Sequence, residues 1–496
     1  MSVRYSGSVG KLSSEVEPSM PDKHKSFSEW YSEILNRAEL VDLRYGVKGA
    51  VVYMPNAMEI VDAIYSMFEE ELKKTGHKKV LFPVFIPEEN LKKESEHFRG
   101  FEGEVFWITK AGNRELDKKL VLRPTSETAI YPIYSLWVRN YRDLPLKLFQ
   151  SVSVYRYETK ATRPLFRGRE FLWIEAHDVF KDEASARKQV TEDTEIFRRV
   201  VYDKLGIPFI HLKREEFDKF AGAVDTYAFE TMLPDGKMLQ IGTTHYLGTN
   251  FSKVFEIRYL DPDGRMRLAH QTCFGIGISR IVGALISIHG DDFGLVLPFS
   301  IAPIQVVIIP IPKREADIEG IKKMATDVEI ELKNQGYRVK TDFSGKTPGE
   351  KFYRYDMLGV PVRIEIGPRE VKRGELTVFR RDRRKREIIK RGDLINYLKF
   401  IEKDMLDFLR RKAEKEFKER LHEARTKNEF IELAKKGNFI IRAGFCGSEK
   451  CAENIKNLTG YEVRGTKAGK EEKLEDKRCI WCGRPAIKVV YIAKAY

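Results

Sequence analysis

Charged and aromatic residues alternate with apolar ones between Arg156 and His177, in the segment RYETKATRPLFRGREFLWIEAH. Arg156 and Glu158 lie two residues apart, so on a strand they would share a face. After an arginine-rich loop, Trp173, Glu175 and His177 alternate with apolar residues that would face a core. The pattern predicts two charged strands that bind a polyanion near the arginines and a small polar ligand near Trp173.

A second group of candidate residues lies in LVLRPTSETAIYPIY, residues 120–134, which predicts a strand that enters a helix. Thr125 or Ser126 can cap the helix, and Glu127 falls in its first turn, where an acid compensates the helix dipole. Capping alone explains these residues without a ligand. The alternative is that the helix start holds Thr125 and Glu127 toward a substrate ammonium.

Two further stretches combine polar residues with glycine. The turn at Pro234-Asp235-Gly236 predicts a hairpin whose second strand carries Gln240, Thr243 and His245. Neighbouring glycines would let a ligand approach closely, although such a strand end can also be only a turn. Arg280 begins an otherwise apolar helix, where an unpaired charge is costly to bury, and this favours contact with a phosphate.

The cysteines predict a metal site rather than disulfides. Four of the five lie near the end of the sequence in two close pairs, Cys446 with Cys451 and Cys479 with Cys482. This spacing is typical of a structural Zn²⁺ site, while unrelated free thiols are the alternative. A reducing, cytoplasmic location fits these cysteines better than a disulfide scaffold.

Composition limits the classes of protein. The chain has 496 residues, a net charge of +14 and a pI of about 9.2, which fits an acidic partner such as nucleic acid and equally a lysine-rich solubilising surface. No apolar run is long enough to span a membrane, and the first residues lack the apolar core of a signal peptide. We therefore expect a globular protein with no membrane partner.

The elements predicted along the chain are typical of an α/β (α+β) protein of several domains. We expect a flexible tail at residues 1–25, a first domain at 26–298, a second at 299–395 and a small third at 396–496. The second has the order β-α-β-α-β-β, and a charged helical segment is predicted over 393–435. Residues 80–87 predict a strand with two prolines, which belongs at a sheet edge or a subunit boundary.

These stretches, in this order, resemble the class II aminoacyl-tRNA synthetases, and specifically the prolyl-tRNA synthetases of the archaeal and eukaryotic type. LFPVFIP resembles motif 1, LRPTSET the proline-binding loop, YRYE to FLWIEAH motif 2, and GIGISR motif 3. The resemblance implies a catalytic domain on an antiparallel sheet, an α/β anticodon-binding domain and a C-terminal zinc-binding α/β domain. It also implies a homodimer, ATP with Mg²⁺, L-proline and tRNA(Pro).

The resemblance assigns roles to individual residues. Arg156 and Arg280 would be catalytic, with Arg156 bridging the substrate carboxylate and the α-phosphate. ATP would be held by Arg156, Glu158, Arg167, Gln240, Thr243 and Arg280, with Gln240 also a candidate to help hold Mg²⁺. Proline would be enclosed by Thr125, Glu127, Arg156, Trp173, Glu175, His177, His245 and Phe101. Zinc would be bound by Cys446, Cys451, Cys479 and Cys482.

Three features complete the comparison with this family. Ile278 and Cys273 stand where related enzymes often carry hydroxyl residues, and the final Tyr496 resembles a tail that folds toward the active site. About 60 residues separate His177 from Gln240, too few for the editing domain that bacterial relatives insert there. Because each missing methylene is worth only ~1–3 kcal/mol, we expect mischarging with alanine or cysteine.

Two alternative functions stay open at this point. The first is another class II synthetase, of the threonyl or glycyl type. The second is a non-catalytic synthetase paralogue that binds RNA, although such paralogues usually lose a motif arginine and Arg156, Arg167 and Arg280 are all present.

Overall fold

A long, mainly antiparallel sheet is the framework of the structure. The computed structural model describes residues 20–93, 103–469, 472 and 478–496, and in this part the sheet has the strand order β20-β21-β23-β22-β9-β10-β11-β14-β8-β7-β3. Only β3 with β7 and β20 with β21 pair in parallel. The strands that the first domain contributes to this sheet are β3 (Lys78–Lys79), β7 (Leu146–Tyr155), β8 (Glu170–Phe180), β9 (Ile210–Lys213), β10 (Asp225–Met232), β11 (Met238–Gly248) and β14 (His270–Gly277).

Helices cover the apolar face of this sheet. Ile174 and Ala176 of β8 are buried in the largest apolar cluster and Leu172 packs against it, which confirms the predicted core face of FLWIEAH. The apolar stripe of each helix requires such a partner. The helices of the first domain are α1 (Phe27–Arg37), α2 (Pro55–Lys74), α3 (Glu88–Lys93), α5 (Glu127–Trp137), α6 (Glu183–Phe197), α7 (Asn250–Phe255) and α8 (Ile278–His289).

The predicted strand over residues 80–87 is shorter than expected. Only Phe85–Pro87 (β4) is a strand, and it forms one edge of a small sheet with β6 (Arg114–Leu122) and β5 (Phe106–Ala111). β4 lies at the edge of this small sheet, as predicted. Its Pro87 has no N–H group to donate to a second neighbouring strand. Pro83 separates this strand from β3, which ends at Lys79.

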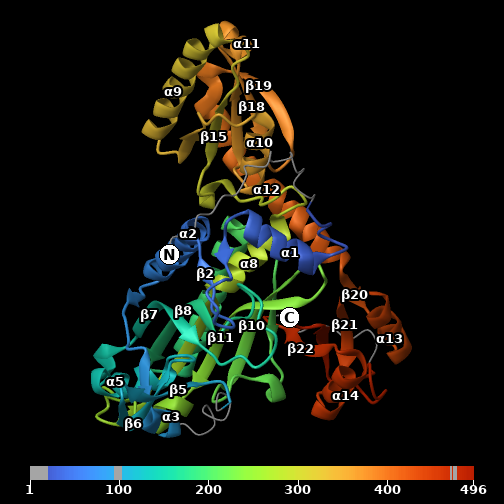
Figure 1. Ribbon diagram of the computed structural model, residues 1–496. Helices are drawn as coiled ribbons and strands as arrows, with labels where there is room; N and C mark the ends of the chain where they lie inside the picture. Colours follow the sequence, from blue (N-terminus) through green and yellow to red (C-terminus); the bar gives the residue numbers. More distant parts are fainter. Residues whose placement is uncertain (1–19, 94–102, 470–471, 473–477) are drawn as a thin grey trace, which may run out of the picture.

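The second domain is set apart at the top of Figure 1. Its five-stranded sheet has the order β16-β15-β17-β18-β19, and the predicted β-α-β-α-β-β order is present with one short additional helix, α11, and one additional strand, β19. The elements are β15 (Val306–Pro310), α9 (Ile318–Asn334), β16 (Val339–Thr341), α10 (Pro348–Met357), β17 (Val362–Ile366), α11 (Pro368–Arg373), β18 (Glu375–Arg380) and β19 (Lys385–Lys390).

The third domain continues the sheet of the first. Its strand β22 (Glu462–Lys467) pairs with β9, so the two domains share one sheet, and α12 (Leu394–Glu419) descends to it from the second domain (Figure 1). The helical segment predicted over 393–435 is interrupted by a strand. The remaining elements are β20 (Leu421–Glu423), α13 (Lys427–Lys436), β21 (Ile440–Phe445), α14 (Glu449–Thr459) and β23 (Lys488–Ala493).

Packing begins before residue 26, where the predicted tail ends. Residues 1–19 lie outside the described part. Lys23, however, is buried, and its Nζ donates to the main-chain oxygens of Ile288 at 2.9 Å and Gly290 at 2.6 Å. This ammonium satisfies carbonyls at the C-terminal end of α8, where a cation is favourable. The flexible-tail prediction therefore does not fit residues 20–25.

A buried acid lies between α6 and the sheet. Asp193 accepts hydrogen bonds from Gln189 at 2.8 Å and Thr244 at 2.7 Å. Asp178 and His77 lie close by, paired with each other at 3.1 Å. Burial, together with the negative charge of Asp178, raises the pKa of Asp193 from 3.8 to about 7.

We expect Asp193 to reduce the stability of the fold as the pH rises. Between pH 3.8 and about 7 the native state keeps a proton that the unfolded state has released. The free energy of unfolding contributed by this group therefore falls through that window. Asp193→Asn should flatten the decline, which denaturant unfolding at acid and neutral pH would measure; an unchanged pH dependence would contradict the assignment.

Candidate active site

Two cross-strand rows bring the predicted site residues together on the open face of the sheet. One row runs from Gln150 through Glu175 and Gly275 to Thr243 on neighbouring strands. The next row runs from His177 through Cys273 and His245 to Thr226. Residues that face each other across a ladder lie close enough to interact, so segments distant in sequence meet here.

The start of α5 closes one side of this face. Ser126 occupies the N-cap position, but its side chain does not cap the helix. Instead its hydroxyl contacts the carboxylate of Glu175, which also accepts from Gln150 at 2.8 Å. Thr125 donates to Glu127 at 2.6 Å. The predicted capping role was therefore wrong for Ser126. Its hydroxyl instead donates to the buried carboxylate of Glu175, which would be costly to bury without hydrogen-bond donors.

Glu175 and His177 form a buried pair at 3.2 Å. Burial opposes ionisation of Glu175, but the hydrogen bonds from His177 and Ser126 outweigh it and hold the pKa of this carboxyl below its ordinary value. Burial likewise opposes the charge on His177, and the carboxylates around it raise its pKa. His177 does not line the cavity itself; it supports Glu175 from behind, with Tyr131 at 3.0 Å on its other nitrogen.

A cavity of about 330 Å³ opens above these rows. The residues predicted from sequence that line it are Thr125, Glu127, Arg156, Trp173, Glu175, Gln240, Thr243 and His245. Phe101, the remaining predicted wall residue, lies outside the described residues. Two carboxylates and an aromatic ring at the wall suit a small cation with an apolar body.

Trp173 forms an apolar wall that depends on a glycine. A Cβ at Gly275 would lie 2.4 Å from the indole of Trp173, so no larger residue fits there without moving the ring. The indole Nε1 is buried and has no hydrogen-bond partner among the described residues. Buried donors are normally satisfied, and a bound molecule is one way to satisfy this one.

Several wall residues were not predicted from the sequence. They are Arg214, Asp218, Lys219, Phe220, Thr226 and Arg464. The segment REEFDKFAGAVDT, residues 214–226, has the polar composition of a solvated turn. Its Phe220 nevertheless lies against His245, with ring centroids 4.6 Å apart. In the sequence, only the two phenylalanines of this charged segment could have indicated a place in a cavity wall. No feature of the sequence indicated such a place for Arg464.

A β-bulge places Gln240 on the same face as Thr243. They lie three positions apart in the sequence, so on a regular strand they would point to opposite faces. The register between β10 and β11 shifts so that Phe229 pairs with Gly242 and Glu230 with Gln240, leaving Ile241 as the extra residue. Ile241 is fully buried in the core, and both polar residues line the cavity.

Of the three arginines predicted to bind ATP, Arg156 alone lines this cavity, whereas Arg167 lines a second one. β7 ends at Tyr155, so Arg156 and Glu158 follow the strand rather than belonging to it as predicted. Arg156 lines the cavity, and its guanidinium lies 5.3 Å from the ring centroid of Phe171. Glu158 pairs with Arg167 at 3.6 Å.

Positive charge is concentrated around Arg280, which donates to the main-chain oxygens of Gln240 and Phe166, each at 2.9 Å. Burial, reinforced by the charges of Arg156 and Arg167, lowers the pKa of Arg280 to about 10. A bound anion would relieve this repulsion, so the arginine side of the cavity can hold phosphate.

Tyr496 contacts the arginine loop, which is the loop that carries Arg163 and Arg167. Arg167 donates to a main-chain oxygen of Tyr496 at 2.6 Å, and Arg163 contacts its hydroxyl. The ring lies 4.7 Å from that of Phe166, and the Tyr496 amide donates to Met238 at 2.9 Å. The last residues therefore fold back to the arginine loop, as the sequence comparison suggested.

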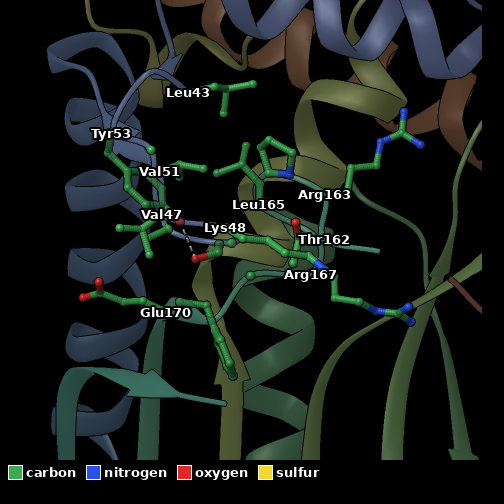
Figure 2. A pocket seen from close by; sticks show the side chains of 17 residues that line it. Leu43, Val47, Lys48, Val51, Tyr53, Thr162, Arg163, Leu165, Arg167 and Glu170 are labelled. Carbon is green, nitrogen blue, oxygen red and sulfur yellow. Dashed lines mark hydrogen bonds between the residues drawn. The ribbon is translucent and has the colours of Figure 1, made fainter. Parts of the chain in front are cut away.

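A second cavity, of about 440 Å³, is lined in part by this loop, residues 162–168 (Figure 2). Val47 and Val51 line it from one side and Leu165 from the other. Figure 2 shows Arg163 and Arg167 extending away from Val47. None of the predicted proline-site residues lines this second cavity, but Arg167, which was predicted to bind ATP, lines it and does not line the first cavity.

The two unusual positions noted in the sequence have clear surroundings. The thiol of Cys273 donates to Glu127 at 3.2 Å, and burial raises its pKa well above the ordinary value, so it stays a neutral donor. Ile278 is fully buried in the core, so it offers no contact to a nucleotide.

The four cysteines of the third domain meet at one point. Their sulfur atoms all lie within 4.8 Å of one another, with Cys446 Sγ 3.7 Å from Cys451 Sγ and 3.8 Å from Cys482 Sγ. Tetrahedral zinc with bonds of about 2.3 Å implies sulfur separations of about 3.8 Å. The residues therefore fit a structural Zn²⁺.

Comparisons with known proteins agree with this geometry. Residues 106–289 match the tRNA synthetase class II core domain (G, H, P, S and T), residues 305–401 an anticodon binding domain, and residues 427–496 the C-terminal domain of prolyl-tRNA synthetase. The first match defines the class as the class II aminoacyl-tRNA synthetases. The chain belongs to the prolyl-tRNA synthetase family.

Full-length relatives support that assignment. Proline–tRNA ligase of Thermofilum pendens is 52% identical over 96% of this chain and 98% of its own, and that of Methanopyrus kandleri 46% over 97% and 98%. Prolyl-tRNA synthetase of Giardia lamblia, in complex with prolyl-adenylate, has a TM-score of 0.93, 35% identity and coverage of 97% and 100%. The Cryptosporidium parvum enzyme, complexed with halofuginone and AMPPNP, has a TM-score of 0.91 and 32% identity over 96% and 99%.

Removal of zinc should unfold the third domain before the catalytic domain. The metal would contribute roughly 10–16 kcal/mol to folding this module. We expect about one zinc per chain by mass spectrometry of metals, and chelation should expose the amides of β21 and α14 to hydrogen exchange ahead of those of β8 and β14. Simultaneous exposure of both regions, or no bound zinc, would contradict this.

Proposed function

We propose that the protein activates L-proline with ATP and transfers it to tRNA(Pro). The observation that carries the proposal is the cavity in which Glu127 and Thr125 face Trp173, next to Arg156. The carboxylate of Glu127 suits the secondary ammonium of proline, and the indole suits its ring. Family membership supports the same reaction.

In the first step a carboxylate oxygen of proline attacks the α-phosphorus of ATP, and pyrophosphate leaves with the electrons of the broken P–O bond. In-line transfer of this kind needs positioning and charge stabilisation more than an acid or base. We assign Arg156 to the carboxylate and α-phosphate, because it alone of the predicted phosphate-binding arginines lines the cavity. In the second step a ribose hydroxyl of tRNA attacks the acyl carbon, and AMP leaves.

The remaining predicted residues take supporting roles. Glu158 would accept from the adenine amino group, Arg167 and Arg280 would hold the outer phosphates, and Mg²⁺ would enter with ATP. On the proline side, Glu175 and His245 would complete the wall, and His177 would act through Glu175. Arg167 is already tied to Tyr496, so the last residue would help position it.

Further proposals concern assembly and organisation. A homodimer is supported by exposed apolar residues around β4 and α5, including Leu81, Phe85 and Trp137. We place the catalytic domain at residues 26–298, the anticodon-binding domain at 299–395 and the zinc-binding domain at 396–496. Among the described residues no helix has the length and apolar character needed to cross a membrane. We retain the cytoplasm as the proposed location, on the ground of the cysteine usage.

The test is amino-acid-dependent ATP–pyrophosphate exchange with each of the twenty amino acids. We expect exchange with proline and weaker exchange with cysteine or alanine, because a proline pocket cannot exclude smaller side chains sterically. Arg156→Ala should abolish exchange without changing the fold. No exchange with any amino acid would instead favour the non-catalytic paralogue. Discrimination above roughly 10⁵-fold against both smaller amino acids would refute the mischarging proposal.

Glu127→Gln should raise the KM for proline at least about tenfold, because the amide cannot pair with an ammonium. The KM for ATP should change far less, since Glu127 lies on the amino-acid side of the cavity. Glu89→Gln, an equal charge change on the exposed surface of α3, is the matched control. Equal effects on both KM values would place Glu127 in a general structural role.

A further inference from the structure

A buried ion network joins the third domain to the wall of the active site. Glu230 of β10 is fully buried and contacts two guanidinium groups, those of Arg214 and Arg464. Arg464 comes from β22 of the third domain, 234 residues away, and its Nε lies 3.1 Å from Glu230. Arg214 also donates to the main-chain oxygen of Arg464 at 2.6 Å. Both arginines line the cavity.

The two arginines compensate the buried charge of Glu230. Burial opposes ionisation of Glu230, but the charges of Arg214 and Arg464 outweigh it and lower the pKa of this carboxyl to about 2. A buried carboxylate with two arginine partners is held in one geometry, because any rotation would leave a charge unpaired. The side chain of Glu230 is therefore held in one position.

Gln240 is the cavity residue whose side chain this network orients. Arg214 Nη2, the nitrogen that contacts Glu230, also donates to Gln240 Oε1 at 2.7 Å. Because a guanidinium can only donate, the amide oxygen of Gln240 must face Arg214. The NH₂ group of Gln240 is left for the cavity, while Arg280 holds its main-chain oxygen at 2.9 Å.

We propose that Arg464 is a positioning residue of the nucleotide site: through Glu230 and Arg214 it fixes the amide of Gln240 with its NH₂ group toward the phosphates of ATP. The inference deepens the proposed function and rests on it for the identity of the nucleotide. It makes Gln240 a hydrogen-bond donor to an anion rather than an oxygen ligand of Mg²⁺. The third domain thereby contributes to ATP binding through the orientation of Gln240.

Close contact between the domains is built into β22. Gly465 has a φ of +118°, and a Cβ there would lie 2.1 Å from the main-chain oxygen of Lys213. A bulge next to Gly465 interrupts the pairing of β22 with β23. Glycine thus lets β22 approach β9, which brings Arg464 next to Glu230.

The first test separates ATP from proline. Arg464→Met combined with Glu230→Gln removes one arginine together with the carboxylate, and Arg214 keeps Asp218, 3.5 Å from its Nε, as a counterion, so the protein should fold. We expect the KM for ATP to rise at least about tenfold, the loss for one hydrogen bond to a charged group, with the KM for proline changed less than about twofold. Lys467→Ala, a loss of charge at an exposed position of the same strand, should leave both values unchanged.

The second test distinguishes the two orientations of Gln240. Gln240→Glu would keep the contact with Arg214 but present a carboxylate oxygen to the phosphates. We expect the KM for ATP to rise at least about tenfold, with an unchanged Mg²⁺ dependence. If Gln240 were an oxygen ligand of Mg²⁺, the carboxylate would preserve activity and lower the Mg²⁺ requirement, and that result would overturn the proposal.

Calorimetric titration with ATP in the absence of proline measures nucleotide binding without amino-acid activation. It therefore tests the role of Arg464 independently of the proposed function. A wild-type protein that exchanges with no amino acid refutes the proposed function. Weaker ATP binding in the double variant, with unchanged thermal stability and zinc content, supports the role of Arg464 in either case. Equal ATP affinity in the wild type and the double variant, or equal losses for ATP and proline, would overturn it.

Discussion

The burial of carboxylates in the central sheet is the constraint on which the rest of the structure depends. Glu175 and Glu230 on the open side and Asp193 beneath the sheet are all almost fully buried. A buried charge is tolerated only with partners, and a single β-strand cannot supply them. Each of these acids therefore draws side chains from distant segments, and those contacts define which elements meet.

The same constraint explains how the two halves of the cavity differ. In one part of the wall the carboxylates of Glu127 and Glu175 lie beside Trp173, which suits an ammonium group. On the other side, Arg280 is crowded by Arg156 and Arg167, so the wall attracts phosphate. Arg156 lines the cavity and lies near Arg280, so in the proposed reaction it would meet both the carboxylate and the phosphate. The charges would then order the two substrates along the cavity.

Domain boundaries read from sequence are less sharp in the fold. The third domain has its own apolar cluster and cysteine site, yet its strand β22 extends the catalytic sheet. Tyr496 returns to the arginine loop of the first domain. The second domain, by contrast, has a separate sheet. A module whose cysteines fit a structural Zn²⁺, and which shares a sheet with the first domain, is well suited to hold residues of the cavity wall rigidly.

The sequence alone determined the local patterns: the alternation around Trp173 and Glu175, the helix start at Glu127 and the paired cysteines. These depend on the period of one strand or helix, or on the spacing of metal ligands. Only the tertiary structure decided that Ser126 serves a carboxylate instead of a cap, that a bulge turns Gln240 toward the cavity, and that Arg464 reaches Glu230. Bulges and buried ion pairs are decided by strand pairing and desolvation, which act between segments that are not neighbours in sequence.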